Sequence, residues 1–415
     1  GPDVIAFLRE NARWLAGGFL LTLFSSYGQT FFIALSSGGI REELGLSHGD
    51  FGWLYMWATL LSAAIIPFAG RFADTVRIDR YAVVVILGLA AFMALLSQAR
   101  SLVVLFVALA GMRMFGQGLM SHAAMTAMGR WFSATRGKAV STAALGHQFG
   151  ESFMPISFVA IAAFAGWRGA WLVNVVLFCL LVLPAVFLLL RVPRMPHASE
   201  AANGAEGRQW TRNEAERDPL FWALLAGLLA PPVIGTTVFF HMVYLTELRG
   251  WALGQFAGST PVLSVFAIAA TFVSGYMIDR FGSAVLLPAM LVCAAIANLT
   301  IGYVEPAWAI VAYMAGMGAS FGLYASAFGA IWPELYGTRH LGAIKGVVTA
   351  LMVFSTALGP GLSGWLIDAG VALPSMIVAM GFYAAFASVA MIAVERVART
   401  RANARKPSPE VIVTT

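Results

Sequence analysis

Residues 102–128 read LVVLFVALAGMRMFGQGLMSHAAMTAM, and residues 138–165 read KAVSTAALGHQFGESFMPISFVAIAAFA. Both runs are apolar, and a short basic turn joins them. At about 1.5 Å per residue, each is long enough to cross a hydrocarbon core of about 30 Å. Each carries one charged residue near its middle, Arg113 in the first and Glu151 in the second. A charge at the centre of a bilayer costs at least about 2.5–3.5 kcal/mol, so these two residues indicate a functional site.

The composition places most of the chain in a membrane. Of 415 residues, 60% are hydrophobic and 11% are charged, and the mean hydropathy is +0.80. A soluble domain has about 25% charged residues. We therefore expect a membrane protein.

Apolar runs of spanning length recur along the whole chain. In hydrocarbon each run must satisfy its own backbone polar groups, so we expect helices. The sequence predicts an all-α membrane protein with twelve transmembrane helices, at residues 12–38, 51–70, 81–99, 102–128, 138–165, 169–190, 219–246, 254–277, 284–304, 307–332, 342–367 and 374–394.

The basic residues indicate the orientation, because cytoplasmic loops carry an excess of Lys and Arg. Placing the N-terminus inside puts most of the 26 Lys and Arg residues on the cytoplasmic side and leaves Arg41, Arg100, Arg168 and Arg249 outside. We expect a multi-pass protein of the inner or plasma membrane with both termini in the cytoplasm.

Several other classes of protein are not indicated. Cys179 and Cys293 lie inside apolar runs without metal-ligand spacing, so we expect neither a disulfide nor a metal site. The net charge of +6 belongs to the predicted inner loops, which would lie against anionic lipid, and does not indicate nucleic-acid binding. No glycine-rich ATP loop occurs, so ATP-driven pumping is not expected. We expect no cofactor and no enzymatic activity.

An internal repeat divides the chain. Gly45-Leu-Ser-His-Gly-Asp-Phe51 falls on Gly250-Trp-Ala-Leu-Gly-Gln-Phe256 at an offset of 205 residues (45 to 250). The same offset relates Gly70 to Gly275, Asp74 to Asp279 and Gly137 to Gly342. It predicts two pseudo-symmetric halves of six helices, at 1–190 and 219–394, with a cytoplasmic linker at 191–218 and a cytoplasmic tail at 395–415. Transporters use such repeats, with the substrate site at the midplane between them.

Two loops resemble a known family motif. Gly70-Arg-Phe-Ala-Asp-Thr-Val-Arg-Ile-Asp-Arg80 and Gly275-Tyr-Met-Ile-Asp-Arg-Phe-Gly282 are similar to the loops after the second and eighth spans of major facilitator superfamily transporters. The first copy has Thr75 and Arg77 where a basic residue and a glycine are usual. The resemblance covers the whole chain and implies transport by alternating access.

A narrower resemblance concerns the central runs. Arg113-Met-Phe-Gly-Gln-Gly118 and Gly146-His-Gln-Phe-Gly150 resemble the oxalate–formate and monocarboxylate branch of that superfamily. Members of this branch usually hold their anion with a cation buried in the second half. Here spans 8 and 11 have none at mid-depth, and Lys345 lies near the end of its span.

Arg113 and Glu151 have two interpretations. Both lie in the middle third of the membrane, so a contact between their helices is possible. The first interpretation is a structural ion pair, whose disruption would cost about 3–5 kcal/mol. In the second, Glu151 carries a proton and Arg113 is its partner or the anchor of the substrate. An anion that recruits Arg113 would then leave Glu151 readier to take a proton.

Further polar residues are candidates for the cavity. His147 is four residues before Glu151 and shares its helical face, where it either relays protons or donates a hydrogen bond to the acid. Gln148 either lines the path or satisfies a backbone carbonyl. Polar residues in otherwise apolar spans either face the substrate or bond neighbouring helices; these are Tyr27, Gln29, Thr30, Thr236, Thr237, His241, Tyr324 and Ser326.

Charged residues at the predicted cytoplasmic ends of spans 2 and 8 are candidates for gating. A carboxylate there can face the positive N-terminus of a neighbouring helix. We expect these loops to hold the inner side shut, against the alternative of a solvated charged run; the residues are Asp74, Arg77, Arg80, Asp279 and Arg280.

The sequence therefore predicts a secondary transporter, driven by protons and carrying a small organic anion such as a monocarboxylate. The expected partners are the small-molecule substrate, protons and membrane lipid, and the expected state is a monomer. Three alternatives remain: a proton-driven drug or metabolite exporter of the same fold, an uncoupled facilitator, and a receptor or scaffold that transports nothing.

Overall fold

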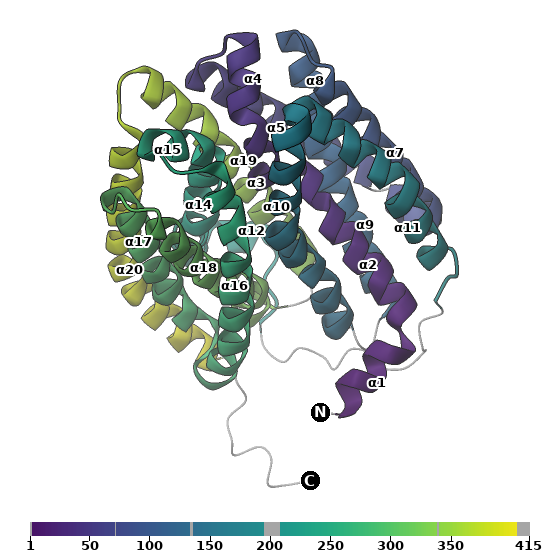
Figure 1. Cartoon of the computed structure of the whole chain (residues 1–415). Coiled ribbons are helices and arrows are strands. Elements are labelled where there is room, and N and C mark those ends of the chain that lie inside the picture. The colour runs from purple at the N-terminus through teal and green to yellow at the C-terminus, as the bar shows by residue number, and fades with distance from the viewer. Residues whose placement is uncertain (1, 71, 133–135, 195–207, 338–339, 405–415) are drawn as a thin grey trace, which may run out of the picture. The chain divides into compact units, whose positions relative to one another are not determined.

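A computed structural model describes residues 2–70, 72–132, 136–194, 208–337 and 340–404, and every element within them is a helix (Figure 1). Side chains are described throughout these ranges except at residues 2–4, 74, 129–130, 136–138, 279 and 341–342. The predicted all-α class is confirmed.

The helices of the first part of the chain are α1 (Pro2–Glu10), α2 (Ala12–Phe24), η1 (Ser25–Gly28), α3 (Thr30–Ile33), η2 (Ala34–Ser36), α4 (Ser37–Leu44), α5 (His48–Gly70), α6 (Phe72–Thr75), α7 (Ile78–Ser97), α8 (Leu102–Met112), η3 (Arg113–Met120), α9 (Ser121–Trp131), α10 (Arg136–Leu177), η4 (Phe178–Val182) and α11 (Leu183–Leu190). Those of the second part are α12 (Arg212–Glu216), α13 (Pro219–Leu228), α14 (Ala230–Phe240), α15 (Met242–Arg249), α16 (Leu253–Phe281), η5 (Ser283–Val285), α17 (Leu286–Tyr303), α18 (Trp308–Tyr336), α19 (Leu341–Asp368) and α20 (Leu373–Ala404).

The described residues contain ten helices that are long and apolar enough to cross a membrane, and the bent pair Ala12–Gly28 and Thr30–Leu44 is an eleventh candidate. One of the ten, Ala139–Leu190, is 52 residues long and contains two predicted spans. Gly166, with φ 71° and ψ 173°, breaks it between them. Counted with this break, the structure is consistent with the twelve predicted helices.

One turn of the predicted repeat recurs in the backbone. Gly45 ends α4 and Gly250 ends α15, and both adopt the left-handed conformation, with φ of 64° and 69°. Glycine suits this position because it has no Cβ. The next helices begin at His48 and Leu253, which are again 205 residues apart (48 to 253). The same turn chemistry therefore starts the second span of each half.

The chain forms two compact units, and we describe each by itself. Unit 1 consists of Gly1–Glu200, Phe239–Pro261 and Pro360–Gly370, and in it α2 packs along α10 while α7 packs against α8. Unit 2 consists of Ala201–Val238, Val262–Gly359 and Val371–Thr415, and in it α17 packs against both α18 and α20.

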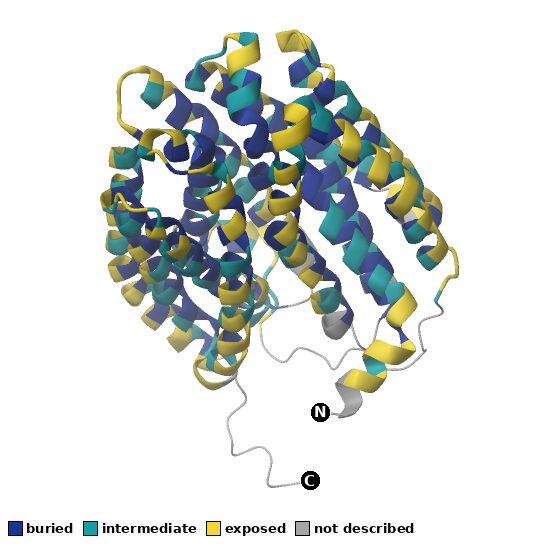
Figure 2. Cartoon of the chain, viewed as in Figure 1, coloured by how far each residue is buried: buried dark blue, intermediate teal, exposed yellow. Residues whose placement is uncertain are grey.

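Each spanning helix has a buried face and an exposed face (Figure 2). The exposed faces carry large apolar side chains, including Val84, Leu180, Phe272 and Phe386, which are 63–80% exposed. Soluble proteins rarely expose so many large apolar side chains together, whereas lipid tails are themselves apolar and can cover them. The exposed surface is therefore typical of a membrane protein.

Candidate substrate site

The first predicted span is broken in its middle. Its helix α2 passes into the 3-10 helix η1, and the chain bends by 48° before α3 begins. Gln29, at the break, is extended, with φ −86° and ψ 149°. The backbone N–H groups of Phe32 and Ile33 both donate to the carbonyl of Gln29. The break exposes the carbonyl of Gly28 to a side chain from another helix.

The span opposite the break is also irregular. Residues 113–120 form the π-helix η3, whose wider turn is frequent at functional sites. Gly28 and Gly116 meet here: a Cβ on either glycine would collide with the backbone of the other. Two irregular backbones are thus in direct contact, and Arg113 is the first residue of the π-helix.

Arg113 is buried, with 4% of its surface exposed, and its Nη1 donates to the Gly28 carbonyl over 2.8 Å. Its guanidinium carbon lies 5.4 Å from the ring centre of Tyr55, whose hydroxyl is 2.6 Å from Thr30 Oγ1. Within the described residues its Nε has no acceptor. A guanidinium has five N–H donors, so this cation retains unused donors inside the span.

Glu151 lies in α10 and is also buried, with 7% exposed. The described residues include both charges, and no ion pair joins Arg113 to Glu151. The structural ion-pair interpretation is therefore corrected. Its physical reason is geometric: the guanidinium of Arg113 points to the broken first span and not to α10.

The residues on either side of Glu151 contact other helices. Gly150 packs so closely on Leu23 and Ser26 that a Cβ would not fit. The carbonyl of Ser152 accepts a hydrogen bond from Thr260 Oγ1 of α16 over 2.8 Å. Glu151 thus lies where α10 meets both the first span and α16.

The neighbours of Glu151 along α10 make contacts with other residues. His147 forms no hydrogen bond to Glu151 within the described part of the chain; its ring lies 6.0 Å from that of Phe31, edge to face. The expected bond from His147 to the acid is therefore absent in this structure. Gln148 is half-buried, and its backbone carbonyl accepts a hydrogen bond from Ser152 Oγ over 2.9 Å.

Two predicted residues of the first span differ in their surroundings. The Tyr27 hydroxyl donates to Asn174 Oδ1 over 2.9 Å, and its ring packs against Phe32 and Phe178. These contacts fit the interhelical alternative for Tyr27, and its assignment to the substrate site stays a prediction. Gln29 is half-buried directly after Gly28, and its side-chain amide has no hydrogen bond to a described residue. It stays a candidate.

Two predicted residues of the second half are engaged elsewhere. His241 Nε2 lies 2.7 Å from the hydroxyl of Ser363 in unit 1. Tyr324 donates to the sulfur of Met352 over 2.9 Å in unit 2. Neither of these two hydrogen bonds involves Arg113.

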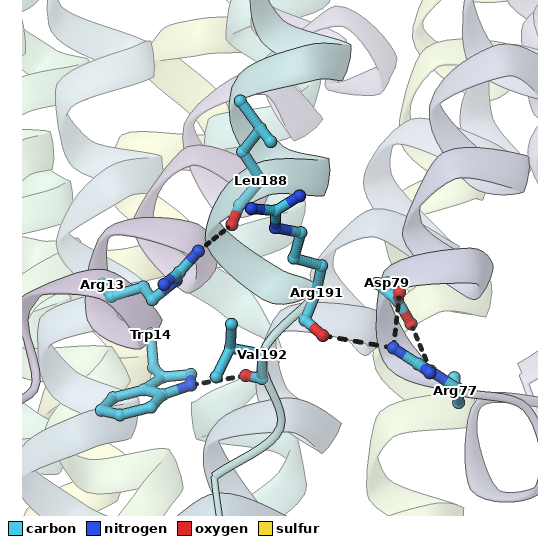
Figure 3. A network of polar contacts seen from close by, with 7 residues as sticks. All are labelled: Arg13, Trp14, Arg77, Asp79, Leu188, Arg191 and Val192. Atoms are coloured by element: carbon cyan, nitrogen blue, oxygen red, sulfur yellow. Dashed lines mark hydrogen bonds and ion pairs between the residues drawn. The ribbon is translucent and has the colours of Figure 1, made fainter.

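Three of the predicted gating residues have described side chains. Arg77 forms an ion pair with Asp79 at 3.1 Å and donates to the backbone carbonyl of Arg191 (Figure 3). Arg80 is exposed, and Arg280 donates to the Tyr276 hydroxyl over 2.7 Å. The side chains of Asp74 and Asp279 lie outside the description.

Unit 1 has a second polar cluster, at the opposite ends of its helices, which sequence reasoning missed. Asp368, the last residue of α19, accepts from Ser47 Oγ over 2.6 Å and from the backbone N–H of Gly49 over 2.9 Å. These groups form the N-terminus of α5, whose dipole favours a carboxylate. The sequence shows that Asp368 is a charged residue at the end of an apolar run, but it does not identify its partner Gly49, which is 319 residues away.

The chain has counterparts among known proteins. The sequence pattern of the family described as the Major Facilitator Superfamily matches residues 18–297 and 260–414. Monocarboxylate transporter 11 of Homo sapiens is 28% identical over 365 residues, covering 83% of this chain and 74% of that protein.

Two solved structures are similar in fold. One is a bacterial homolog of the human lysosomal transporter Spinster, inward-facing and unoccupied, with a TM-score of 0.69, 16% identity, and coverage of 96% of this chain and 99% of that one. The other is a mutant of the nucleoside transporter NupG, with a TM-score of 0.69, 13% identity, and coverage of 92% and 99%. At these identities the likeness concerns the fold alone.

Proposed function

The chain belongs to the Major Facilitator Superfamily, and from this premise we propose that it is a proton-coupled secondary transporter of a small organic anion such as a monocarboxylate. It is a multi-pass membrane protein with a small-molecule substrate. We further propose that it works as a monomer in the inner or plasma membrane, with both termini in the cytoplasm.

The observation that carries the proposal is the unpaired Arg113. A buried cation is costly unless a counter-charge reaches it. Within the described residues it has one backbone carbonyl and one aromatic ring, and no carboxylate. A carboxylate on the substrate would supply the missing charge and could accept two parallel N–H bonds from the guanidinium. The likeness to a monocarboxylate transporter supports the same class of substrate.

Glu151 supports the coupling to protons. An ionised carboxylate without a cation beside it is expensive at this depth, and binding a proton removes the charge. We propose that Glu151 takes a proton when the substrate anion occupies Arg113, so that anion and proton cross together as a neutral pair. Gln29, beside the Arg113 acceptor, provides a further donor for the anion.

Arg113→Gln tests the substrate site. The purified protein is screened by thermal shift against monocarboxylates, nucleosides and cationic drugs, because a ligand that binds the folded form raises its melting temperature. We expect a shift with a monocarboxylate that Arg113→Gln removes. Loss of a charged hydrogen bond of about 1.5–3 kcal/mol corresponds to affinity roughly 10- to 150-fold weaker. Arg100→Gln is the matched control, since Arg100 is exposed between two spans.

A shift with cationic drugs or nucleosides alone would contradict the anion proposal and favour an exporter or a nucleoside carrier. An Arg113→Gln protein that binds the anion normally would remove Arg113 from the site.

Glu151→Gln tests the coupling. In liposomes with an imposed proton gradient, we expect the variant to exchange substrate at the normal rate but to lose accumulation, because its amide cannot take up a proton. The measurement is substrate uptake, with and without the gradient, beside internal pH. Ser157→Ala, on the same helix, should behave as the parent. Undiminished accumulation by Glu151→Gln would favour an uncoupled facilitator or another proton carrier.

A further inference from the structure

A hollow lies in unit 1, away from Arg113. It has a cavity volume of about 220 Å³ and is lined by Arg77, Ile78, Asp79, Ala127, Trp131, Leu190, Arg191 and Pro193. The start of α7 and the ends of α9 and α11 all contribute to it. The transport proposal assigns it no role.

The depth of this hollow in the membrane follows from the ends of its helices. The candidate spans begin at Ile78, end at Met128 and end at Leu190. Three apolar spans thus end at its walls, and the level at which such spans end is the boundary between acyl chains and headgroups. Trp14 and Trp131 lie at the same helix ends, as interfacial tryptophans do. The hollow therefore opens at headgroup level.

Side chains around the hollow donate hydrogen bonds to the backbone carbonyls at the C-terminal end of α11. Arg13 donates to the carbonyls of Leu188 and Leu189, and Trp14 Nε1 donates to the carbonyl of Val192 (Figure 3). Arg77 donates to the carbonyl of Arg191 and holds Asp79 with two hydrogen bonds. These contacts satisfy carbonyls that a helix end leaves without partners.

The Arg191 side chain takes no part in these contacts. It is exposed, and no described residue accepts a hydrogen bond from its guanidinium, although Figure 3 shows that group with those of Arg13 and Arg77 around the end of α11. Arg77 Nη1 also has no acceptor in the described residues. Asp79 is the one carboxylate of the lining, and Arg77 neutralises it. The lining therefore retains one uncompensated positive charge.

We propose that this hollow binds the phosphate headgroup of an anionic glycerophospholipid. Water occupies about 30 Å³ per molecule, so the hollow holds the volume of about seven waters. That suits a headgroup and excludes a whole lipid. The acyl chains then lie outside, along exposed apolar side chains of α11 such as Phe187 and Leu188. Basic pockets between spanning helices are suited to such headgroups.

The test uses the purified full chain, stripped of lipid in detergent. Phosphatidylglycerol and phosphatidylcholine are titrated separately, and binding is followed by melting temperature and by native mass spectrometry. We expect phosphatidylglycerol to bind more tightly. We expect Arg191→Gln to weaken its binding about fivefold, the effect of removing one basic residue near the headgroup. Arg191→Lys should retain most of the affinity, and Arg100→Gln, an exposed arginine at the opposite helix ends, should retain all of it.

Arg191→Gln should not unfold the protein, because only the backbone carbonyl of Arg191 bonds Arg77. Equal binding of the two lipids, or phosphatidylglycerol binding that Arg191→Gln leaves unchanged, would overturn the site. Inorganic phosphate and glycerol phosphate are titrated in the same way. If either binds as tightly as the lipid, the hollow is a site for free phosphates and the lipid proposal is wrong.

Discussion

Charged residues follow two patterns in this protein. Several at helix ends are paired, as in Arg168 with Glu43 at 2.7 Å and in Arg401 with Asp218. The two in the middle of spans, Arg113 and Glu151, have no oppositely charged partner in the described residues. The paired charges hold helix ends together, whereas those at mid-depth are the ones that we propose for the substrate and the proton.

Asp218 carries a prediction about acid stability. Burial by itself would raise the pKa of Asp218, but hydrogen bonds from Arg401, Tyr336 and the Leu220 N–H outweigh it and hold that pKa below its ordinary value. The folded protein then binds this proton less readily than the unfolded chain. The stabilisation is complete above the unfolded pKa of about 3.9 and is lost as pH falls through the folded value.

Asp218→Asn keeps a good N-cap for α13 but loses the charge. We expect it to cost about 1–3 kcal/mol at neutral pH, since it weakens charged hydrogen bonds. The difference from the parent should shrink below about pH 4. Melting temperatures from pH 3 to 7 in detergent measure this, and a difference that is constant with pH would show that the Asp218 charge is not responsible.

At the scale of elements, the site depends on two departures from regular helix. The first span breaks at Gln29, and the fourth widens into the π-helix η3. Contact between Gly28 and Gly116 brings the two irregular segments together, so the carbonyl of one can meet the arginine of the other. The surroundings of Arg113 are thus a product of backbone geometry.

Gly116→Ala tests this contact. A Cβ at Gly116 would collide with the backbone of Gly28, which has no flexible side chain to move aside. Overpacking of this kind costs about 1–3 kcal/mol. We expect a lower melting temperature and a weakened ligand-induced shift. Gly258→Ala is the matched control, because a Cβ there meets nothing within 4 Å. A variant that melts and binds like this control would refute the proposed close contact.

At the scale of the molecule, unit 1 joins segments of both predicted halves. Residues 239–261 and 360–370 pack with the first 200 residues, and bonds such as Asp368 to Ser47 hold them. Alternating access requires contacts between halves to form and break. The predicted repeat does not extend to the charges: at the same offset of 205, Gly318 stands in place of Arg113 (113 to 318) and Thr356 in place of Glu151 (151 to 356). The charged chemistry belongs to one half.

A cross-link tests whether the Ser47–Asp368 contact opens during transport. In a background without Cys179 and Cys293, Ser47→Cys with Asp368→Cys is joined by a short thiol cross-linker. We expect flux in liposomes to stop, and to return when a cleavable linker is reduced. Glu43→Cys with Arg168→Cys joins an ion pair within the first half and should leave flux intact. Full flux with Ser47 and Asp368 joined would mean that this contact never opens.

The spans and their order were predictable from the sequence. The predicted run 102–128 matches the observed span Leu102–Met128, and 284–304 matches Ser283–Tyr303 within one residue at each end. Apolar length determines both, because the bilayer requires about 20 apolar residues per crossing and leaves no alternative to a helix. The motifs at Gly70 and Gly275 indicated the superfamily, because they recur at equivalent places between the spans.

The pairing of side chains was not predictable in this way. Position along a span determines the depth of Arg113 and Glu151, but it says nothing about the direction in which each helix turns them. That direction depends on the break at Gln29, on the π-helix and on the packing of Gly28 against Gly116, which involve residues about 85 positions apart. The sequence by itself thus determined that two charges lie in the membrane, and only the tertiary structure decided that they stand apart, because local composition sets depth whereas long-range packing sets direction.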